Sequence, residues 1–440
     1  MNAKTQRAAV SQTLVLDDRI RGVPPGVADL PIAAVAEQNW RPAAGLMSLP
    51  VLTLDEAAFA HNRDLMLRYT REQGVEIAPH GKTPMAPDLA LSLIEAGAWG
   101  ATVADIRQAA VMLRAGVTRL ILANEVGGRG GAARLAALLK AWPQAEVYVF
   151  VDSVATAHAY AEAWRHEAAA PPLRVLVELG AGRSGARTLP AAAAILDAIV
   201  VEGTGRLVSA GVAAYEGSAA PGPEGVLPVI ADLLRLTGEL LAMVRKQVGP
   251  DQPLLVTAGG SVFFDKVVAA LKPLVVADPA ATLVLRSGAI FFHDHGVYER
   301  ALLALDERGG FHLGGEKVAA ATAFRPALRL WAEVLSRPEA GLAVVGMGMR
   351  DVSFDQGMPR PLRLHRNGIL LREIEAGALK IEKLNDQHAF LSCGAGDDIQ
   401  VGDVFEFGIS HPCTCLDRYR VIFGVDASGQ VRHAFPTFFG

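Results

Sequence analysis

Lys82 is the residue whose type and position most directly suggest covalent chemistry. It lies in the segment Ala78–Pro84 (APHGKTP), after the apolar run Gly74–Ile77 and before the helically spaced stretch Asp88–Gly97. A lysine just past a strand end is commonly a solvated loop residue. Alternatively, its amine lies in a partly desolvated pocket, where the neutral form can attack a carbonyl carbon and form a Schiff base. The position alone leaves both interpretations open.

Two glycine-bearing segments could bind a phosphate group. Ala258–Ser261 (AGGS) and Arg286–Ala289 (RSGA) each follow a short apolar run. In a barrel they would be the loops after the seventh and eighth strands, where free backbone N–H groups converge on an anion. Glycines mostly serve turns, so either loop alone says little. With two such loops at the expected strands, a phosphate-bearing ligand and a purely structural role for the glycines have equal weight.

A third glycine-rich segment, Gly180–Gly185 (GAGRSG), matches the pattern G-x-G-x-x-G of dinucleotide sites. It follows the fifth strand of an unbroken alternation, and an arginine occupies the turn. The acidic residue expected about 20 positions later would be Asp197 or Glu202, neither clearly at a strand end. The context therefore disfavours a nicotinamide cofactor.

His411 and Cys413 form a His-x-Cys pair within Ser410–Cys415 (SHPCTC). In an extended segment the imidazole and the thiolate point to the same side, which suits zinc. Two protein ligands do not complete a site, and such a pair is often structural. If zinc is bound by few protein ligands, water or substrate completes the shell, as in catalytic sites. His388 is a possible further ligand or supporting contact.

The elements that must position these residues alternate regularly. Stretches of helical length separate short apolar runs, and eight such strands over about 230 residues predict a (β/α)₈ barrel with a buried parallel sheet. The expected strands are Val75–His80, Trp99–Ala104, Arg119–Asn124, Glu146–Val151, Arg174–Leu179, Leu207–Ala214, Pro253–Ala258 and Thr282–Arg286.

The remaining sequence predicts two further parts. Residues 1–50 are irregular and proline-bearing, with one expected strand at Thr13–Leu16, and are predicted to be an arm that packs with the C-terminal domain. The barrel is predicted to span 51–310. Residues 311–440 lose helical spacing and predict an all-β domain carrying the metal motif. Its expected strands are Leu342–Val345, Gly368–Glu373, Leu379–Asn385, His388–Ser392, Asp403–Phe407 and Tyr419–Val425.

Composition excludes several classes of function. With 440 residues, 51% hydrophobic residues and a net charge of −4, the chain can bury a large core but offers no basic surface for nucleic acid. Its three cysteines argue against a disulfide framework and for a reducing compartment. No apolar start typical of a signal peptide and no apolar run of ~18–20 residues occurs. These features predict a cytoplasmic protein without a membrane partner.

The motifs resemble those of fold-type III pyridoxal-phosphate (PLP) enzymes, within them the D-serine dehydratase and D-threonine aldolase group, whose relatives include alanine racemase. The likeness is carried by Pro79–Thr83 (PHGKT), by Val177–Gly185 (VELGAGRSG) and by Leu285–Gly288 (LRSG) before Phe291–Asp294 (FFHD), and it covers roughly residues 50–425. Two departures are the N-terminal arm and the segment Arg350–Gly357. A third is Gln387-His388-Ala389, where Glu-His-Gly is usual.

The resemblance implies a role for each of these residues. Lys82 would carry PLP as an internal aldimine and act as the catalytic base. The residues implied to contact the PLP ring or phosphate are Arg183, Tyr215, Gly260, Ser261, Arg286, Gly288 and Ala289. His411 and Cys413 would bind zinc, or Mn²⁺ or another divalent metal, in the His-x-Cys form of the dehydratases, whereas the aldolases carry His-x-Asp.

The implied function is a lyase reaction on a D-amino acid. A PLP- and zinc-dependent dehydratase would convert a β-hydroxy D-amino acid, of the D-serine or D-threonine type, to a 2-keto acid and ammonia. The alternatives are metal-dependent D-threonine aldolase-type cleavage to glycine and an aldehyde, and a non-catalytic PLP carrier. The family also implies a homodimer with active sites between the barrel and the β domain.

Overall fold

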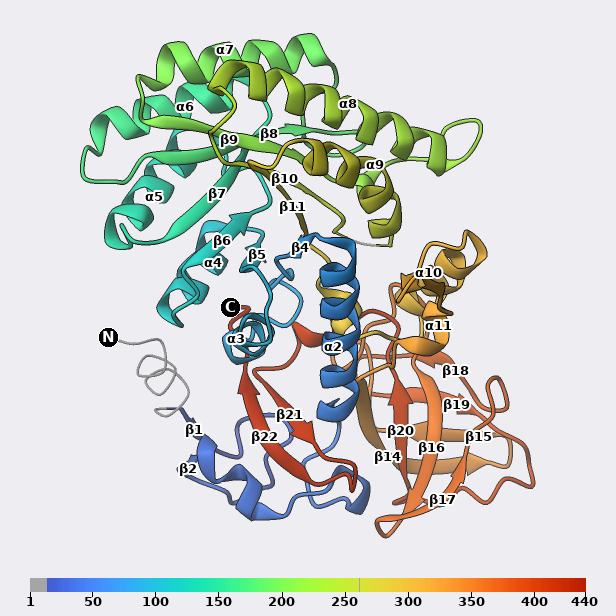
Figure 1. Ribbon diagram of the computed structural model, residues 1–440. Helices are drawn as coiled ribbons and strands as arrows, with labels where there is room; N and C mark the ends of the chain where they lie inside the picture. The colour runs from blue at the N-terminus through green and yellow to red at the C-terminus, as the bar shows by residue number, and fades with distance from the viewer. Residues whose placement is uncertain (1–13, 261) are drawn as a thin grey trace.

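The computed structural model describes residues 14–260 and 262–440. Its upper part in Figure 1 is a barrel of eight parallel strands. Parallel pairing of His80 with Thr102 joins the first strand's extension to the second strand, so the sheet closes. The strands are β4 (Glu76–Ile77), β5 (Ala101–Val103), β6 (Arg119–Leu122), β7 (Glu146–Val151), β8 (Leu173–Leu179), β9 (Leu207–Ala214), β10 (Leu254–Ala258) and β11 (Ala281–Leu285). The predicted barrel is confirmed.

Helices cover the outside of this barrel (Figure 1). Several start at a side chain that accepts a hydrogen bond from a free N–H of the first turn, as Asp105 does from Gln108 and Thr188 from Ala191. The helices are α2 (Glu56–Gln73), α3 (Pro87–Glu95), α4 (Ile106–Arg114), α5 (Gly128–Ala141), α6 (Val154–His166), α7 (Leu189–Gly203), α8 (Val226–Val248), α9 (Phe264–Ala277) and α10 (Val297–Glu307). Among the described residues no helix is both long and apolar enough to span a bilayer.

The interior of the barrel is filled by an apolar plug. It is made by one residue or more from most strands, including Ile121, Phe150, Leu176 and Val284. Because side chains alternate along a strand, residues two positions later face the same interior but lie nearer the C-terminal ends. Several of those positions hold ionisable side chains instead of apolar ones, among them His80, Glu178 and Arg286. The plug therefore forms a floor beneath a polar layer.

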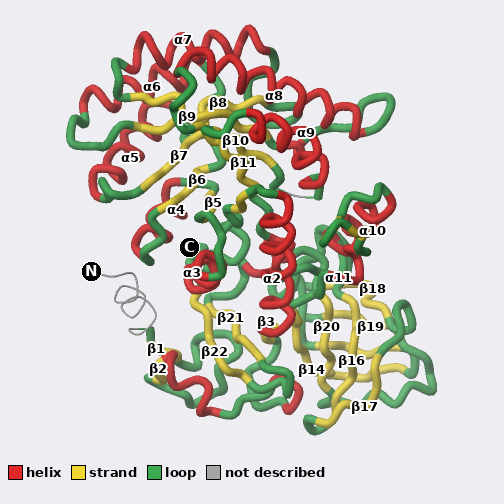
Figure 2. The backbone as a smooth tube through the Cα atoms, in the orientation of Figure 1, coloured by secondary structure: helices red, strands yellow, loops and turns green. Residues whose placement is uncertain are grey.

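The lower part of the molecule is rich in strands (Figure 2). A sheet with the order β17-β16-β20-β14-β15-β19-β18 also bonds to β3 and, through it, to β21 and β22. The predicted C-terminal β domain is confirmed as a mostly-β domain, with the short helices α11 (Ala320–Ala323) and α12 (Pro412–Leu416) between its strands. The strands are β3 (Val51–Asp55), β14 (Leu328–Glu339), β15 (Leu342–Val345), β16 (Arg360–Arg366), β17 (Ile369–Glu373), β18 (Lys380–Leu384), β19 (Ala389–Ser392), β20 (Val404–Gly408), β21 (Val421–Val425) and β22 (Val431–Pro436).

The N-terminal segment packs on this second sheet. Leu16, Val35 and Trp40 share an apolar cluster with Trp331 and Phe423. Of the expected strand at Thr13–Leu16, residue 13 lies outside the described residues, and the observed pair is β1 (Val15–Leu16) with β2 (Leu30–Pro31). β3, at the start of the segment expected to be barrel, pairs with β14 and β21 instead. The domain boundaries at residues 50 and 310 stay predictions.

Candidate active site

A cavity of about 200 Å³ lies where the C-terminal ends of the barrel strands meet the β domain. The sequence-predicted residues that line it are Lys82, Arg183, Tyr215, Gly260, Arg286, Gly288, Ala289, His411 and Cys413. Ser261 lies outside the described residues. The fold thus brings nine of the ten predicted residues to one place, while the role of each remains a prediction.

The loop that carries Lys82 is held by backbone contacts to β5. Gly81 N–H donates to the Thr102 carbonyl at 2.8 Å, and the Thr102 hydroxyl donates to the Ala78 carbonyl at 2.7 Å. The Lys82 side chain is exposed and lines the cavity. Burial, together with the positive charges of Lys82 and Arg286, lowers the pKa of His80 well below its ordinary value. The imidazole beside the lysine is therefore neutral.

Arg183 and Tyr215 form one wall. The Arg183 guanidinium lies 5.0 Å from the centre of the Tyr215 ring, a cation–π contact. The glycines around Arg183 serve close packing, because a Cβ on Gly182 would lie 1.8 Å from the Ser218 carbonyl oxygen. This gives the G-x-G-x-x-G pattern a structural cause and supports the sequence-based preference against a dinucleotide site.

The two glycine loops at the other side keep their backbone close to neighbouring groups. A Cβ on Gly260 would lie 2.8 Å from the Tyr215 ring, and one on Gly288 would lie 2.7 Å from the His80 carbonyl oxygen. Ala289 begins a short 3₁₀ helix that continues to Phe291. Only glycine fits at positions 260 and 288, so main-chain atoms bound the cavity on this side. Backbone N–H groups are the kind of surface that binds phosphate oxygens.

Arg286 is fixed in the polar layer above the plug. It is buried, donates to the Thr257 hydroxyl at 2.8 Å and to the Ala214 carbonyl at 2.7 Å, and lies 5.4 Å from the Phe150 ring centre. Burial lowers its pKa, while the nearby carboxyl groups of Glu216 and Glu178 oppose that shift. The two hydrogen bonds and the ring contact hold the side chain in place.

Glu178 was not predicted as a site residue, although it stands in the motif before Arg183. It is buried beside Glu125, and burial followed by the Glu125 hydrogen bond raises the pKa of its carboxyl to about 8. Ionising Glu178 in this buried position beside a second carboxyl group is costly, so Glu178 keeps its proton to a higher pH than an exposed glutamate does. The signal available in the sequence was an acidic residue at an inward-facing strand position.

This proton has a predictable effect on stability. Between pH 4.5, the ordinary pKa, and about pH 8, folded Glu178 keeps a proton that the unfolded chain has lost, so stability falls as pH rises. Glu178→Gln supplies an uncharged hydrogen-bonding group and removes this loss. We expect the Tm of Glu178→Gln to exceed that of wild type by an amount that grows from pH 5 to pH 8 and then levels off. The corresponding gain in the free energy of unfolding is on the order of 3 kcal/mol.

Thermal melts across a pH series measure this difference. Glu382→Gln, on an exposed position of β18, controls for loss of a negative charge. An advantage for Glu178→Gln that is constant with pH, or that shrinks as pH rises, contradicts the raised pKa of Glu178.

The His-x-Cys pair enters the cavity from the β domain. The expectation of an extended segment is wrong beyond His411, because α12 (Pro412–Leu416) begins at the next residue. Both side chains of the pair nevertheless line the cavity and interact with each other. The interaction with Cys413 raises the pKa of His411 to about 9. Burial acts in the opposite direction, and Asp355 adds to the increase. Burial acts to raise the pKa of the Cys413 thiol, but the interactions with His411 and Thr83 outweigh burial, so the pKa is lowered.

Thr83 links this motif to the lysine loop. Its hydroxyl oxygen lies 3.4 Å from the Cys413 sulfur, so the residue next to Lys82 touches the thiol. Thr83 and Tyr298 also line the cavity, although neither was predicted as a site residue. His388, considered as a further ligand, is exposed between β18 and β19 and does not line the cavity. Among the described residues no cluster of three or more His, Cys, Asp or Glu side chains is arranged to hold a metal.

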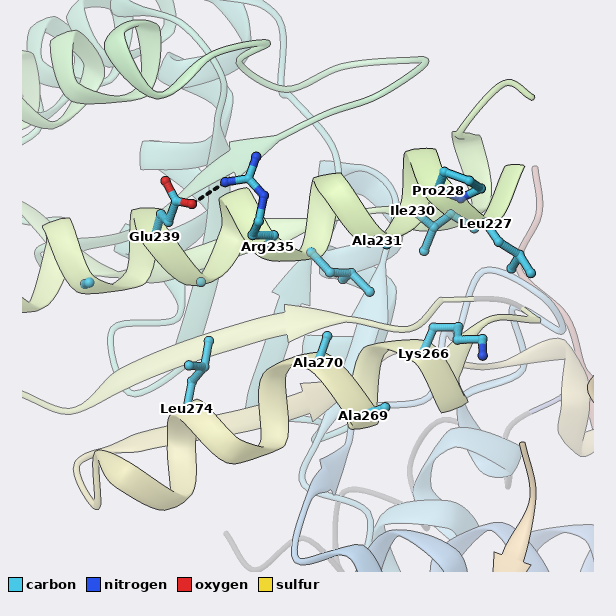
Figure 3. Close-up of a pocket in the computed structure, with 13 residues that line it drawn as sticks. Leu227, Pro228, Ile230, Ala231, Arg235, Glu239, Lys266, Ala269, Ala270 and Leu274 are labelled. Atoms are coloured by element: carbon cyan, nitrogen blue, oxygen red, sulfur yellow. Dashed lines mark hydrogen bonds and ion pairs between the residues drawn. The ribbon is translucent and has the colours of Figure 1, made fainter. Parts of the chain in front are cut away.

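A larger hollow lies elsewhere. It is a surface groove of about 910 Å³ between α8 and α9 (Figure 3), lined mainly by apolar side chains such as Leu227, Ile230 and Leu274. An ion pair between Arg235 and Glu239 stands at its edge. None of the predicted site residues lines it. Size alone therefore does not identify the reactive site, and the smaller polar cavity is the candidate.

Comparison with known proteins agrees with this geometry. Residues 54–239 match the family "Alanine racemase, N-terminal domain", and residues 327–425 match the "Putative serine dehydratase domain". The chain therefore combines these two domains, and the expected resemblance to the fold-type III PLP enzymes of the D-serine dehydratase and D-threonine aldolase group is confirmed. The first match holds the lysine loop and the barrel strands from β4 to β9, and the other holds most of the β domain and the His-x-Cys pair.

The individual relatives of this chain are distant. A D-threonine aldolase from Arthrobacter sp is 29% identical over 136 residues, which are 31% of this chain and 35% of that protein, so the match spans about a third of the curated relative. The crystal structure of D-threonine aldolase from Filomicrobium marinum has a TM-score of 0.68 at 24% identity, covering 89% of this chain and 95% of that one.

A second structural relative is D-threo-3-hydroxyaspartate dehydratase from Delftia sp. HT23. It has a TM-score of 0.65 at 21% identity, covering 89% of this chain and 98% of that one. Two variants of D-threo-3-hydroxyaspartate dehydratase are similar to the same extent. In one a histidine is replaced by alanine, and in the other a cysteine two positions later is replaced, in a metal-free form. At these identities the structures establish the shared fold.

Proposed function

We propose that the protein is a PLP- and zinc-dependent dehydratase. It converts a β-hydroxy D-amino acid, of the D-serine or D-threonine type, to a 2-keto acid and ammonia. The observation that carries the proposal is the single cavity in which Lys82 meets His411 and Cys413, with Thr83 in contact with the thiol. An amine that moves a proton and a metal-binding pair that activates a hydroxyl are both needed for such an elimination.

The cavity suits PLP. The main chain at Gly260 and Gly288, where no side chain fits, is the proposed place for the phosphate, and Lys82 is the proposed attachment point. Arg183, Tyr215 and Arg286 would bound the ring. When bound, PLP supplies an electron sink for the electron pair left at Cα after proton removal.

The side chains of the cavity have separate proposed roles in the elimination. The Lys82 amine takes the proton from Cα, which its exposure to the cavity permits. The Cβ–O bond then breaks, and the hydroxyl leaves as water after gaining a proton. The aminoacrylate released afterwards hydrolyses to the 2-keto acid and ammonia. Arg183, in contact with the Tyr215 ring, would place a positive charge beside the bound substrate and cofactor.

His411 and Cys413 are the proposed metal ligands. Nitrogen and thiolate donors together suit zinc, and two protein ligands leave positions for water and substrate. Zinc there would polarise the β-hydroxyl as a Lewis acid and make it a better leaving group. The histidine and cysteine replaced in the D-threo-3-hydroxyaspartate dehydratase variants have the same spacing, and the cysteine variant is described as metal-free. Mn²⁺ or another divalent cation could occupy the same site.

The runner-up is D-threonine aldolase-type cleavage to glycine and an aldehyde. It is favoured by the similarity to the Arthrobacter D-threonine aldolase, but Cys413 stands where the resembling aldolases carry aspartate. A non-catalytic PLP carrier fits less well, because residues of the β domain line the cavity. Homodimer assembly and a cytoplasmic location remain part of the proposal.

A product assay tests this choice. The purified PLP-loaded protein is offered D-serine, D-threonine and D-threo-3-hydroxyaspartate, with the L-enantiomers as controls. We expect 2-keto acid and ammonia in equal amounts from at least one D-substrate. Glycine with an aldehyde would establish the aldolase instead, and absence of turnover on the whole panel would refute the dehydratase proposal.

A further inference from the structure

The segment between β15 and β16 packs against the His-x-Cys motif. Its part Arg350–Gly357 was noted in the sequence as a departure from the better-known relatives, without an assigned purpose. Ser353 Oγ accepts a hydrogen bond from the His411 backbone N–H at 3.2 Å. The Asp351 carbonyl accepts one from the Tyr419 hydroxyl at 2.8 Å. These contacts fix the segment on both sides of α12.

Asp355, near the end of this segment, uses both carboxylate oxygens. Its Oδ2 lies 2.6 Å from His411 Nδ1, and its Oδ1 accepts a hydrogen bond from the Thr414 hydroxyl at 2.7 Å. The two donors come from one motif, so they fix the direction of the carboxylate as well as its distance. Thr414 lies between Cys413 and Cys415, which places the whole contact at the metal-binding pair.

The contact decides which ring nitrogen of His411 is free. With Nδ1 hydrogen-bonded to Asp355, Nε2 is the nitrogen left for a metal ion. A ligating histidine that donates its other N–H to a carboxylate has a fixed tautomer, a fixed ring orientation and greater basicity. We propose that Asp355 is the positioning carboxylate of the metal site, which accepts the Nδ1 proton and so presents Nε2 to a divalent cation shared with Cys413.

This inference rests on the proposed function, since it requires a metal at His411 and Cys413. It assigns a purpose to a segment that neither the cofactor nor the proposed reaction uses. The chain also supplies a comparison, because His433 Nδ1 lies 2.8 Å from Glu56 Oε1 on the surface. That pair is a histidine–carboxylate contact outside the cavity. If Asp355 acts through the metal site, only its own contact should influence metal binding.

Zinc affinity, measured by competition with a chromophoric chelator on the PLP-loaded protein, tests the proposal. We expect Asp355→Ala to bind zinc about 10–100-fold more weakly than wild type, and Asp355→Asn, which keeps one acceptor oxygen, to lie between them. Glu56→Gln, which changes the surface pair, should bind as wild type does. The melting temperature and the PLP absorbance should be unchanged in all three variants.

Cobalt(II) in place of zinc gives a readout that a purely structural role would not move. In Asp355→Ala we expect a retained thiolate-to-cobalt charge-transfer band from Cys413 and shifted ligand-field bands from a reoriented His411. Wild-type zinc affinity in Asp355→Ala would overturn the inference and leave the proposed function intact. A wild-type protein that binds no zinc would refute the metal part of the proposed function, and the inference with it.

A second variant covers the case in which Asp355→Ala does not fold. Thr414→Val removes the other hydrogen bond to the carboxylate without touching the histidine. We expect a smaller loss of zinc affinity, of a few-fold. Unchanged affinity in Thr414→Val would then count against the positioning role.

Discussion

Lys82→Ala is expected to yield a protein that no longer holds PLP covalently and has lost nearly all turnover. The loop carrying Lys82 is fixed on β5 and delivers this side chain to the cavity. Because the same amine is the proposed attachment point and the proposed base, removing it should lower turnover by at least ~10²–10⁴-fold. Absorbance spectra before and after reconstitution, and borohydride reduction followed by peptide mass analysis, measure the attachment.

The control for this variant is Lys266→Ala. Lys266 is another accessible lysine, at the surface groove between α8 and α9, outside the candidate site (Figure 3). It should keep the PLP spectrum and full turnover. Reduction of the wild type should label one peptide, the one containing Lys82. A label on a different lysine, or an unchanged spectrum in Lys82→Ala, would show that the attachment point has been assigned wrongly.

The barrel could be predicted from sequence because each of its strands carries a local signal. β8, for example, was expected at Arg174–Leu179 and spans Leu173–Leu179. An apolar run between two helical stretches must be a buried parallel strand, and the order follows from right-handed crossovers. Chain order alone thus fixes which strand ends meet, and it brought Arg183 and Arg286 to the same cavity as Lys82.

The β domain gave weaker signals. β14 (LRLWAEVLSRPE) was missed although it is the longest strand, because the polar residues Arg329 and Glu333 interrupt its apolar pattern. β16 (RPLRLHR) was missed because Pro361 argues against a central strand. The structure accommodates this proline next to a register shift between Pro361 and Arg363. The pairing of β14 and the register shift at Pro361 both depend on the partner strand, so neither can be predicted from the sequence of the strand alone.

The parts of the site that escaped prediction are contacts between distant segments. Asp355 and His411 are 56 positions apart, and Thr83 and Cys413 are 330 apart. Local spacing carries no information about such pairs. Glu178 is different, because alternation in β8 already places it inside the barrel. What the sequence could not show was that Glu125, from another strand end, is its neighbour and helps to raise the pKa of its carboxyl group.

Loss of the metal is expected to stop elimination while leaving cofactor attachment intact. Cys413→Ser replaces the thiolate, the softer of the two proposed ligands, by a weak hydroxyl donor. Lewis-acid polarisation supplies several kcal/mol in comparable sites, so keto acid formation should fall by at least ~100-fold. Chelator treatment of the wild type should have the same effect, and added zinc should restore the wild type but not Cys413→Ser. Cys393→Ser, a change outside the cavity, should behave as wild type.

A second measurement on the same variant separates the two proposed roles. If Lys82 removes the α-proton and the metal assists only departure of the hydroxyl, Cys413→Ser in D₂O should still exchange the α-hydrogen of D-serine for deuterium. Exchange without elimination would locate the defect at the Cβ–O bond. Loss of both would mean that the metal pair also orients Lys82, which the contact between Thr83 and Cys413 makes physically possible. Keto acid formation that survives complete zinc removal would refute any role for the metal in the reaction.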